Sequence, residues 1–520
     1  MGNASSDFLA QRMIFASIKS EIIFQQGFRW FQLGTLACAL ASLLGAFSGS
    51  EIQSIGAGLV YFFVVIAASR SAGFQANPLA LLFCEFTFLF MNVPVAFILA
   101  RGSAYIFGEG VIVAITQESI RGVLPGALLF LTVITASAMY GMALVRIKPR
   151  LVNLRPMADI GEIPVLILVL IVVVLSYLQG LDYGDAKGSG IAPGESLISF
   201  LFFDHACWIL VGVFLFAKAN DTGVARSANK AANWMAVYFL IFVSQHAYNG
   251  SKAAVYVTII FVVLVPMSQF RLQRGSSSLF LTKGAIAAVL LMAIPLYYFS
   301  MIKRVSMATG EGFDVSAALG GVSMLGLVDV TDLIDTVFYR FAMGGFDRFL
   351  LVYQSFISDT PEFSYRIEYS WYLFESSINL ITPGTPFPES YAPSSQLFPF
   401  VIERGSMEGR YEDATSLIAA MNTQPYTGYG VFMICFGFLS PLVTFLFMIS
   451  TTLALRRFAS PLLVIATIYF FHGFLSSYGL DAVIGNTFHL VVSMAFLYVA
   501  AHGLTAIANG YKSNALRAGD

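Results

Sequence analysis

The stretch "IFVSQHAYNGSKAAVYVTII", residues 241–260, interrupts a long apolar run with a short polar centre. That centre brings together an imidazole, an Asn-Gly pair, a serine and a lysine: His246, Asn249, Gly250, Ser251 and Lys252. Asn-Gly is a strong turn signal, and serine suits the N-cap of the helix that follows. The pattern predicts two antiparallel apolar helices joined by a tight polar turn.

The composition of the whole chain agrees with this local pattern. Of the 520 residues, 57% are hydrophobic and only 11% are charged, whereas soluble domains carry about 25% charged residues. We therefore expect an all-α polytopic membrane protein. The net charge of −1 gives no reason to expect a nucleic acid partner. The four cysteines, Cys38, Cys84, Cys207 and Cys435, all fall in apolar segments and are typical of small core residues.

A helix of about 20 apolar residues spans a bilayer. That rule predicts about twelve transmembrane helices: 30–49, 55–69, 78–100, 123–145, 163–181, 197–217, 234–248, 252–270, 284–301, 428–454, 459–476 and 482–507.

The loops predict the topology. With the N-terminus inside, basic residues concentrate on the inner side, whereas the short outer loops hold only Arg101, Arg121, Lys187 and Lys252. Both termini are then cytoplasmic. We expect three parts: helices 1–9 in residues 1–301, one large extracytoplasmic (periplasmic) loop domain in 302–427, and helices 10–12 with a cytoplasmic tail in 428–520.

The long outer segment is predicted to be partly structured. Its runs 328–356 and 368–381 have the spacing of amphipathic helices. The run 382–400 that follows is rich in proline and aromatic residues and lacks regular periodicity.

Ionisable residues inside membrane spans are costly and often functional. In the predicted topology most of them gather near the outer ends of the spans: Asp204, His205, His246, Lys252, His472, Asp481 and His489. Glu85 and His502 depart from this pattern. Each residue alone is also explained as a satisfied structural group, but the clustering indicates a site that faces outward.

Lys252 lies in the first turn of the helix that Ser251 caps. A cation opposes the helix dipole there, whereas a lysine together with a helix N-terminus is suited to hold an anion. The alternative is a lysine that anchors a short helix by extending its ammonium group to the interface.

The outer segment supplies further cations. Arg340 and Arg348 are eight residues apart, about two turns on one face of a continuous helix, although Gly344 and Gly345 stand between them. Arginine makes two-bond contacts with phosphate, and the alternative is pairing with loop acids. The aromatic residues nearby are candidates either for stacking on sugars or for the core of a small domain: Phe338, Tyr339, Phe341, Phe346 and Phe349.

Several motifs are absent from the sequence: GxxxxGK[ST], HExxH, a Cys/His cluster with metal spacing, and GxSxG at a strand-to-helix turn. We therefore expect no cofactor and no metal. An anion held at leaflet depth fits a polyprenyl diphosphate, which is a leaving group that needs electrostatic stabilisation.

Four stretches of the chain resemble bacterial O-antigen or oligosaccharide repeat-unit polymerases. They are "NGSK" (249–252), "YRF…DRF" (339–349), "ITPGTPFPES" (381–390) and "TGYGVFMICFGFLSPL" (427–442). The resemblance implies a membrane glycosyltransferase of the C-type superfamily. Such an enzyme polymerises undecaprenyl-diphosphate-linked repeat units into a surface polysaccharide, such as the O-antigen of lipopolysaccharide. It implies the bacterial inner membrane, with the active site facing the periplasm.

We assign expected roles on this basis. The diphosphate and glycan would contact Asn249, Ser251, Lys252, Arg340, Arg348 and Arg366. The base or orienting group would be His246, or else Asp347 or Glu368. Expected partners are the lipid-linked oligosaccharide, the bilayer, a chain-length regulator and a flippase. An O-antigen ligase-like transferase and a lipid-linked oligosaccharide transporter remain as alternatives.

Overall fold

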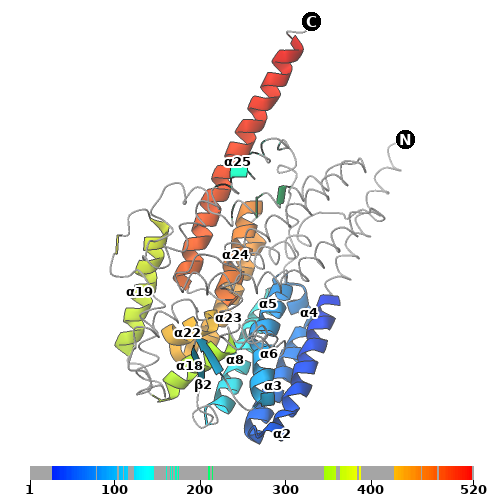
Figure 1. Ribbon diagram of the computed structural model, residues 1–520, viewed down its shortest axis with the longest axis vertical. Coiled ribbons are helices and arrows are strands. Elements are labelled where there is room, and N and C mark those ends of the chain that lie inside the picture. The colour runs from blue at the N-terminus through cyan, green and yellow to red at the C-terminus, as the bar shows by residue number, and fades with distance from the viewer. Residues whose placement is uncertain are drawn as a thin grey trace, which may run out of the picture.

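The computed structural model describes residues 26–77, 79–101, 105–108, 111–114, 122–145, 345–358, 363–382, 386–387, 427–457, 460–476 and 480–517, with isolated positions between 160 and 214. These residues form a bundle of helices with one two-stranded hairpin (Figure 1).

The first half of the bundle begins with an apolar N-terminal helix, Gln26–Ser48, whose last turn is α2 (Gly45–Ser48). The elements that follow are α3 (Ile52–Ser69), α4 (Ala72–Gln75), α5 (Ala80–Phe86), the π-helix η1 (Thr87–Asn92), α6 (Val93–Arg101), the strands β1 (Tyr105–Gly108) and β2 (Val111–Ala114), and α8 (Leu124–Leu144).

The second half begins with two helices from the predicted outer segment, α18 (Phe346–Ser358) and α19 (Phe363–Ile381). After them come α22 (Gly428–Phe436), the short 3-10 helix η2 (Gly437–Leu439), α23 (Ser440–Arg457), α24 (Pro461–Ser476) and the long α25 (Leu480–Arg517).

Six helical segments of the described chain are long and apolar enough to cross a membrane: Gln26–Ser48, Ile52–Ser69, Ala80–Ala100, Leu124–Leu144, Gly428–Arg457 and Val483–Ile507. Each coincides with a predicted span, which confirms a helical protein with membrane-spanning character. The predicted span 459–476 falls on α24, whose apolar part, Leu462–Leu475, is shorter. The five spans predicted within 163–301 lie outside the described residues, apart from isolated positions, so the total of twelve stays a prediction.

Two predicted spans differ locally from the structure. The span 78–100 contains η1, where the helix widens for six residues between α5 and α6. The span 428–454 is broken at η2, because Gly437 adopts a left-handed backbone (φ +57°) that ends α22. Beside the helices, the structure has the short strands β1 and β2, which pair antiparallel from Tyr105 with Ala114 to Gly108 with Val111.

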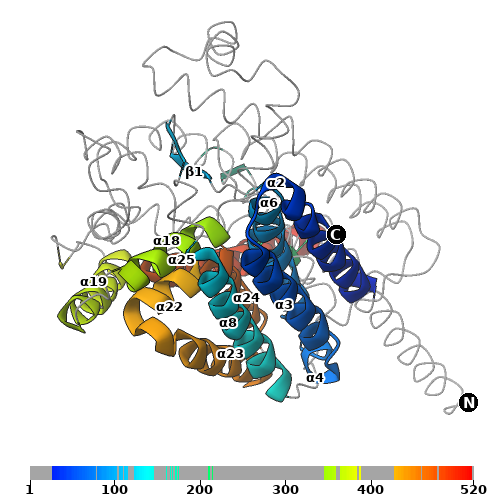
Figure 2. The same ribbon diagram turned by 90° about the horizontal axis from the view of Figure 1, so that it is seen from below.

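Helix α8 is the centre of the packing. It lies between α3 and α23 (Figure 2), and its face Leu128, Leu131, Ile134 and Ala138 is fully buried. Apolar side chains gain little from leaving lipid, so close helix contact through small residues drives such association. At Gly141, a Cβ would come within 2.7 Å of the Phe445 carbonyl oxygen of α23, so glycine permits this approach.

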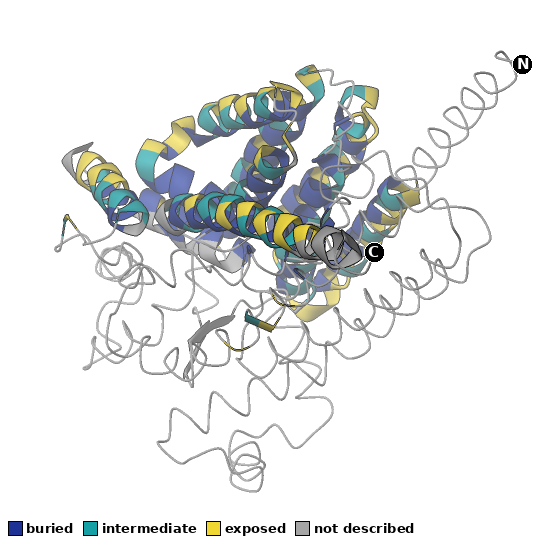
Figure 3. Ribbon diagram, turned by 90° about the horizontal axis from the view of Figure 1, so that it is seen from above, coloured by how far each residue is buried: buried dark blue, intermediate teal, exposed yellow. Residues whose placement is uncertain are grey.

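Buried and exposed residues alternate along the outer helices. Figure 3 shows buried, intermediate and exposed residues following one another along α25. The exposed positions of the candidate spans are largely apolar, among them Leu129, Val133, Leu442, Leu446, Phe496 and Val499. An apolar exterior around a packed interior is what a lipid environment requires.

Buried polar side chains link the helices. In the turn between α4 and α5, Asn77 donates hydrogen bonds to the carbonyl oxygen of Met142 and to the hydroxyl of Thr452, each 3.1 Å long. Its own oxygen accepts from the backbone N–H of Leu79 at 3.0 Å. One amide therefore joins this turn to α8 and α23. In an apolar interior such groups must be satisfied within the protein.

A second network forms at η1. The Tyr61 hydroxyl of α3 donates to Asn92 Oδ1 at 2.8 Å, and Asn92 Nδ2 donates to Thr35 Oγ1 at 2.9 Å. The Thr35 hydroxyl in turn donates to the Phe31 carbonyl oxygen at 2.8 Å. The network ties the N-terminal helix and α3 to the end of the π-helix.

We predict that Asn92→Ala lowers stability by about 1 kcal/mol or more, because the buried Tyr61 hydroxyl loses its acceptor. The measurement is the fraction of monodisperse protein left after heating in detergent. Tyr140→Phe is the control, since this tyrosine is 62% exposed, and a surface change of this kind stays within about 0.5 kcal/mol. Equal losses for the two variants would contradict the role given to Asn92.

Candidate functional site

The predicted site residues fall into three groups. Five lie outside the described residues: His246, Asn249, Ser251, Lys252 and Arg340. Asp347 and Arg348 lie in the first turn of α18, where the structure describes the backbone but not their side chains. Arg366 and Glu368 lie on α19 and are described with their side chains.

Helix α18 is fastened to the bundle by aromatic stacking. The Phe349 ring stacks on Phe130 of α8, with centroids 6.1 Å apart and planes 11° apart, and Tyr353 contacts the same ring at 5.8 Å. Phe346 and Phe349 are both fully buried, so these two rings are core residues and not a platform for sugars. Burial also raises the pKa of the Tyr353 phenol.

The start of α18 is set by a close backbone approach. Gly345 precedes the helix, and a Cβ there would overlap the Phe90 carbonyl group of η1. Glycine is therefore required at this position for packing against the π-helix. The described helix begins only at Phe346, which places Arg348 in its first turn.

Helix α19 packs against α25 and α22. Its contact face is buried: Tyr369, Leu373, Ser376 and Ser377. At its C-terminal end, the Asn379 side chain accepts from the Phe387 backbone N–H at 2.8 Å and donates to the Phe387 carbonyl oxygen at 2.6 Å. These two hydrogen bonds tie part of the proline-rich run to α19. Apart from the asparagine itself, no feature of the sequence predicts them.

Arg366 lies where α19 meets the break between α22 and α23. Its guanidinium carbon is 5.1 Å from the centroid of the Phe356 ring of α18, a cation–π distance. A Cβ at position 437 would come within 2.9 Å of Arg366 Nη1. Gly437 thus has two reasons to be glycine: its left-handed backbone and the room that it leaves for the arginine.

The hydrogen-bonding state of Arg366 is unusual. Its Nε is buried and has no hydrogen-bond acceptor, and no carboxylate of the described residues forms an ion pair with it. The pairing with loop acids that would make this arginine purely structural is therefore not seen in the described part of the chain. A buried donor without an acceptor is costly, and an anion would satisfy it.

Glu368 does not share this site. It is exposed, and residues two apart on a helix face different directions. The structure therefore separates the predicted anion contact, Arg366, from this candidate base. The role assigned to Glu368 stays a prediction.

Two of the three histidines of the last two helices are buried. His472 of α24 and His489 of α25 are 7% and 4% exposed, and these two helices pack together. His502 lies further along α25, with its ring 4.5 Å from that of Tyr498 and its Nε2 buried without an acceptor or donor. In the described part of the chain, none of these three histidines contacts Arg366.

The structure shows a cluster of polar side chains at η1 that no sequence pattern indicates. The hydroxyl groups of Thr135 and Tyr429 are buried and make no hydrogen bond of normal geometry, and Thr135 lies beside both Tyr429 and Tyr61. Tyr429 packs edge-on against Phe86 at 5.8 Å. Hydroxyl groups from α3, α8 and α22 therefore lie together beside the π-helix η1. Short π-helices are often found at functional sites.

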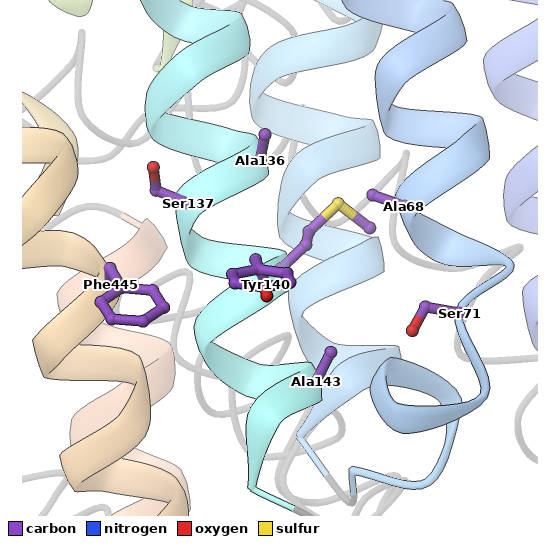
Figure 4. Close-up of a pocket in the computed structure, with 8 residues that line it drawn as sticks. Ala68, Ser71, Ala136, Ser137, Tyr140, Ala143 and Phe445 are labelled. Atoms are coloured by element: carbon purple, nitrogen blue, oxygen red, sulfur yellow. The ribbon is translucent and has the colours of Figure 1, made fainter.

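The structure also has an apolar groove between α3, α8 and α23, with a volume of about 390 Å³ (Figure 4). Small side chains make room for it: Ala68, Ser71, Ala136, Ser137 and Ala143. The rings of Tyr140 and Phe445 stack at one side, with centroids 6.1 Å apart. None of the predicted site residues that the structure describes lines this groove, and its apolar lining does not suit a phosphate.

Within the described ranges, no group of three or more His, Cys, Asp or Glu side chains is placed to hold a metal ion. Cys38, Cys84 and Cys435 are free thiols, and Cys207 lies outside the described residues.

Comparison with known proteins identifies no relative, because no family model, no curated protein and no solved structure matches the chain.

We predict that Gly345→Ala destabilises the attachment of α18, because the new methyl group must displace the η1 backbone, at a cost of about 1–3 kcal/mol. Limited proteolysis of the purified protein within residues 345–358 should become faster.

Gly56→Ala in α3 is the matched control. Nothing lies within 4 Å of its added Cβ, so this variant should be neutral or up to about 1 kcal/mol more stable. Equal cleavage rates for the two variants would show that the approach at Phe90 is not a constraint.

Proposed function

We propose that this protein is a membrane glycosyltransferase that polymerises undecaprenyl-diphosphate-linked oligosaccharide units into a surface polysaccharide. The proposal rests on the sequence resemblance of its outer turn, its arginine-bearing segment and its glycine-rich "TGYGVFMICFGFLSPL" run. The observation that carries it furthest is the environment of Arg366. This predicted diphosphate contact has a guanidinium that lies against Phe356 and Gly437, with a buried Nε–H that no acceptor in the described part of the chain satisfies.

The site around Arg366 suits a diphosphate. Phe356 covers one face of the guanidinium, which leaves the N–H groups at its edge to donate. Gly437, at the start of η2, has no side chain, which leaves room for the guanidinium of Arg366 beside the break. A fixed arginine in a water-poor setting stabilises charge better than a solvated one.

The proposed reaction transfers the glycan to a hydroxyl of the next lipid-linked unit. The bond between the anomeric carbon and the diphosphate oxygen breaks, and a bond from that carbon to the acceptor oxygen forms. The leaving diphosphate gains negative charge, which Arg366, Arg348, Arg340 and Lys252 would stabilise. The acceptor proton would pass to His246 or Asp347, because Glu368 faces away from Arg366.

The proposal includes a topology. Twelve spans with both termini in the cytoplasm would place residues 302–427 in the periplasm of a bacterial inner membrane. Alkaline phosphatase is active only outside the cytoplasm, so we expect activity from a fusion at about residue 360 and none from a fusion at about residue 225. The reverse pattern would overturn the outward site, whatever the chemistry.

We predict that Arg366→Ala lowers turnover of purified lipid-linked repeat units by about 10²–10³, as for the loss of one preorganised donor. Arg366→Lys should recover only part of this, because an ammonium group cannot make the planar two-bond contact. Turnover is measured as polymer length against time in nanodiscs.

Arg456→Ala is the control, since this arginine is exposed in the last turn of α23. Polymers of normal length from Arg366→Ala would show that the arginine only packs on Phe356. Transfer to a lipid A core in place of a second repeat unit would favour the ligase alternative. Movement of the lipid-linked unit across the bilayer without any transfer would favour a transporter.

A further inference from the structure

Helix α19 carries an exposed apolar stripe on the side that does not contact the bundle. Ile367, Trp371 and Phe374 follow each other at helical spacing and are 53%, 58% and 51% exposed. The rings of Trp371 and Phe374 contact one another, with centroids 5.4 Å apart. The stripe is thus a continuous surface and not three isolated side chains.

The polar residues of α19 border this stripe without interrupting it. Arg366 and Ser370 lie on the side of the break at Gly437: the Arg366 guanidinium adjoins that glycine, and the Ser370 hydroxyl lies against Cys435 and donates to the Arg366 carbonyl oxygen. Glu368 and Glu375 lie on the other side by their helical positions. The helix therefore has one packed face, one apolar face and a charged edge, as in helices that rest in a membrane surface.

The stripe continues onto a candidate membrane span. Beside Arg366 the break between α22 and α23 exposes Phe436, Phe438 and Leu439, at 43%, 56% and 66%. These residues belong to the apolar segment Gly428–Arg457. Phe438 also contacts Phe356, the ring that Arg366 covers, at 6.3 Å. Exposed apolar side chains of the span and the stripe on α19 are thus both next to Arg366.

The position of α19 agrees with this continuity. It packs along α25, whose residues Val483–Ile507 form another candidate span, and Figures 1 and 2 both show the two helices side by side. The opposite side of α19 carries no packed element among the described residues. Tryptophan is enriched where a protein surface meets the headgroup region of a bilayer.

We propose that the stripe Ile367–Trp371–Phe374 lies against the acyl chains of the bilayer, so that α19 is a lipid-facing helix attached to the membrane bundle. A glycan is the other occupant that aromatic rings could suit, but Ile367 offers no ring face, and exposed apolar residues of a candidate membrane span lie beside the same arginine. In this position α19 holds Arg366 at the edge of the membrane, at the depth of lipid headgroups.

The stripe contains one of the four tryptophans, which makes the test direct. The triple variant Trp30→Phe, Trp208→Phe, Trp234→Phe leaves Trp371 as the only tryptophan, and the protein is placed in phosphatidylcholine nanodiscs. We expect lipids brominated on the acyl chains to quench most of its fluorescence, and aqueous acrylamide to quench little. If the triple variant does not fold, the difference between the full chain and Trp371→Phe reports the same residue.

A matched variant tests which side of α19 faces lipid. Trp371→Phe combined with Glu368→Trp in the same background moves the probe to the charged edge, where acrylamide should quench and brominated lipid should not. Strong acrylamide quenching of Trp371 without any effect of brominated lipid would overturn the proposal in favour of a water-exposed or glycan-binding surface. Quenching by neither agent would overturn it in favour of a surface covered by protein. This test is independent of the proposed transferase activity.

Discussion

The structure depends on one constraint: a polar group buried between apolar helices must find its partner within the protein. At η1 the helix widens and places Asn92 between Tyr61 and Thr35, where its amide serves as acceptor for one and donor to the other. This network joins the N-terminal helix and α3 to the middle of the third span. The elements that build the candidate site pack against the same part of the span.

A series of contacts brings α18, α22 and the break at Gly437 together around Arg366. Gly345 allows α18 to begin against the Phe90 carbonyl, and Tyr429 holds α22 against Phe86. Helix α18 then presents Phe356, and the break after α22 presents Gly437, to the same guanidinium, Arg366. The position of Arg366 thus depends on four helices, α5, α18, α19 and α22, and on the π-helix η1, although each contact taken alone is ordinary.

Regular, strongly apolar elements were predicted well, and local departures were not. The spans 55–69, 123–145 and 482–507 coincide with α3, α8 and the apolar part of α25, because length and hydropathy suffice to define a spanning helix. The π-helix η1 and the break at η2 were not predicted. A π-helix has no characteristic amino-acid composition by which a sequence would reveal it, and a single glycine in an apolar run is usually tolerated. For Phe346 and Phe349 the sequence allowed two roles, stacking on sugars or forming a small core. Only the packing against α8 distinguishes a core ring from an exposed one.

The sequence by itself determined that this chain is a helical membrane protein, since its composition is compatible with almost no other environment, and it identified Arg366 as a cation worth testing. Only the tertiary structure decided that Arg366 stands over Phe356, with an Nε that has no acceptor among the described residues. It also decided that Glu368 faces away from this arginine and that α19 exposes an apolar stripe. The physical reason is that hydropathy is a sum over neighbours in sequence. Contact, burial and pairing instead depend on residues such as Phe90, Phe356 and Gly437, which only the packing of distant helices brings to one place.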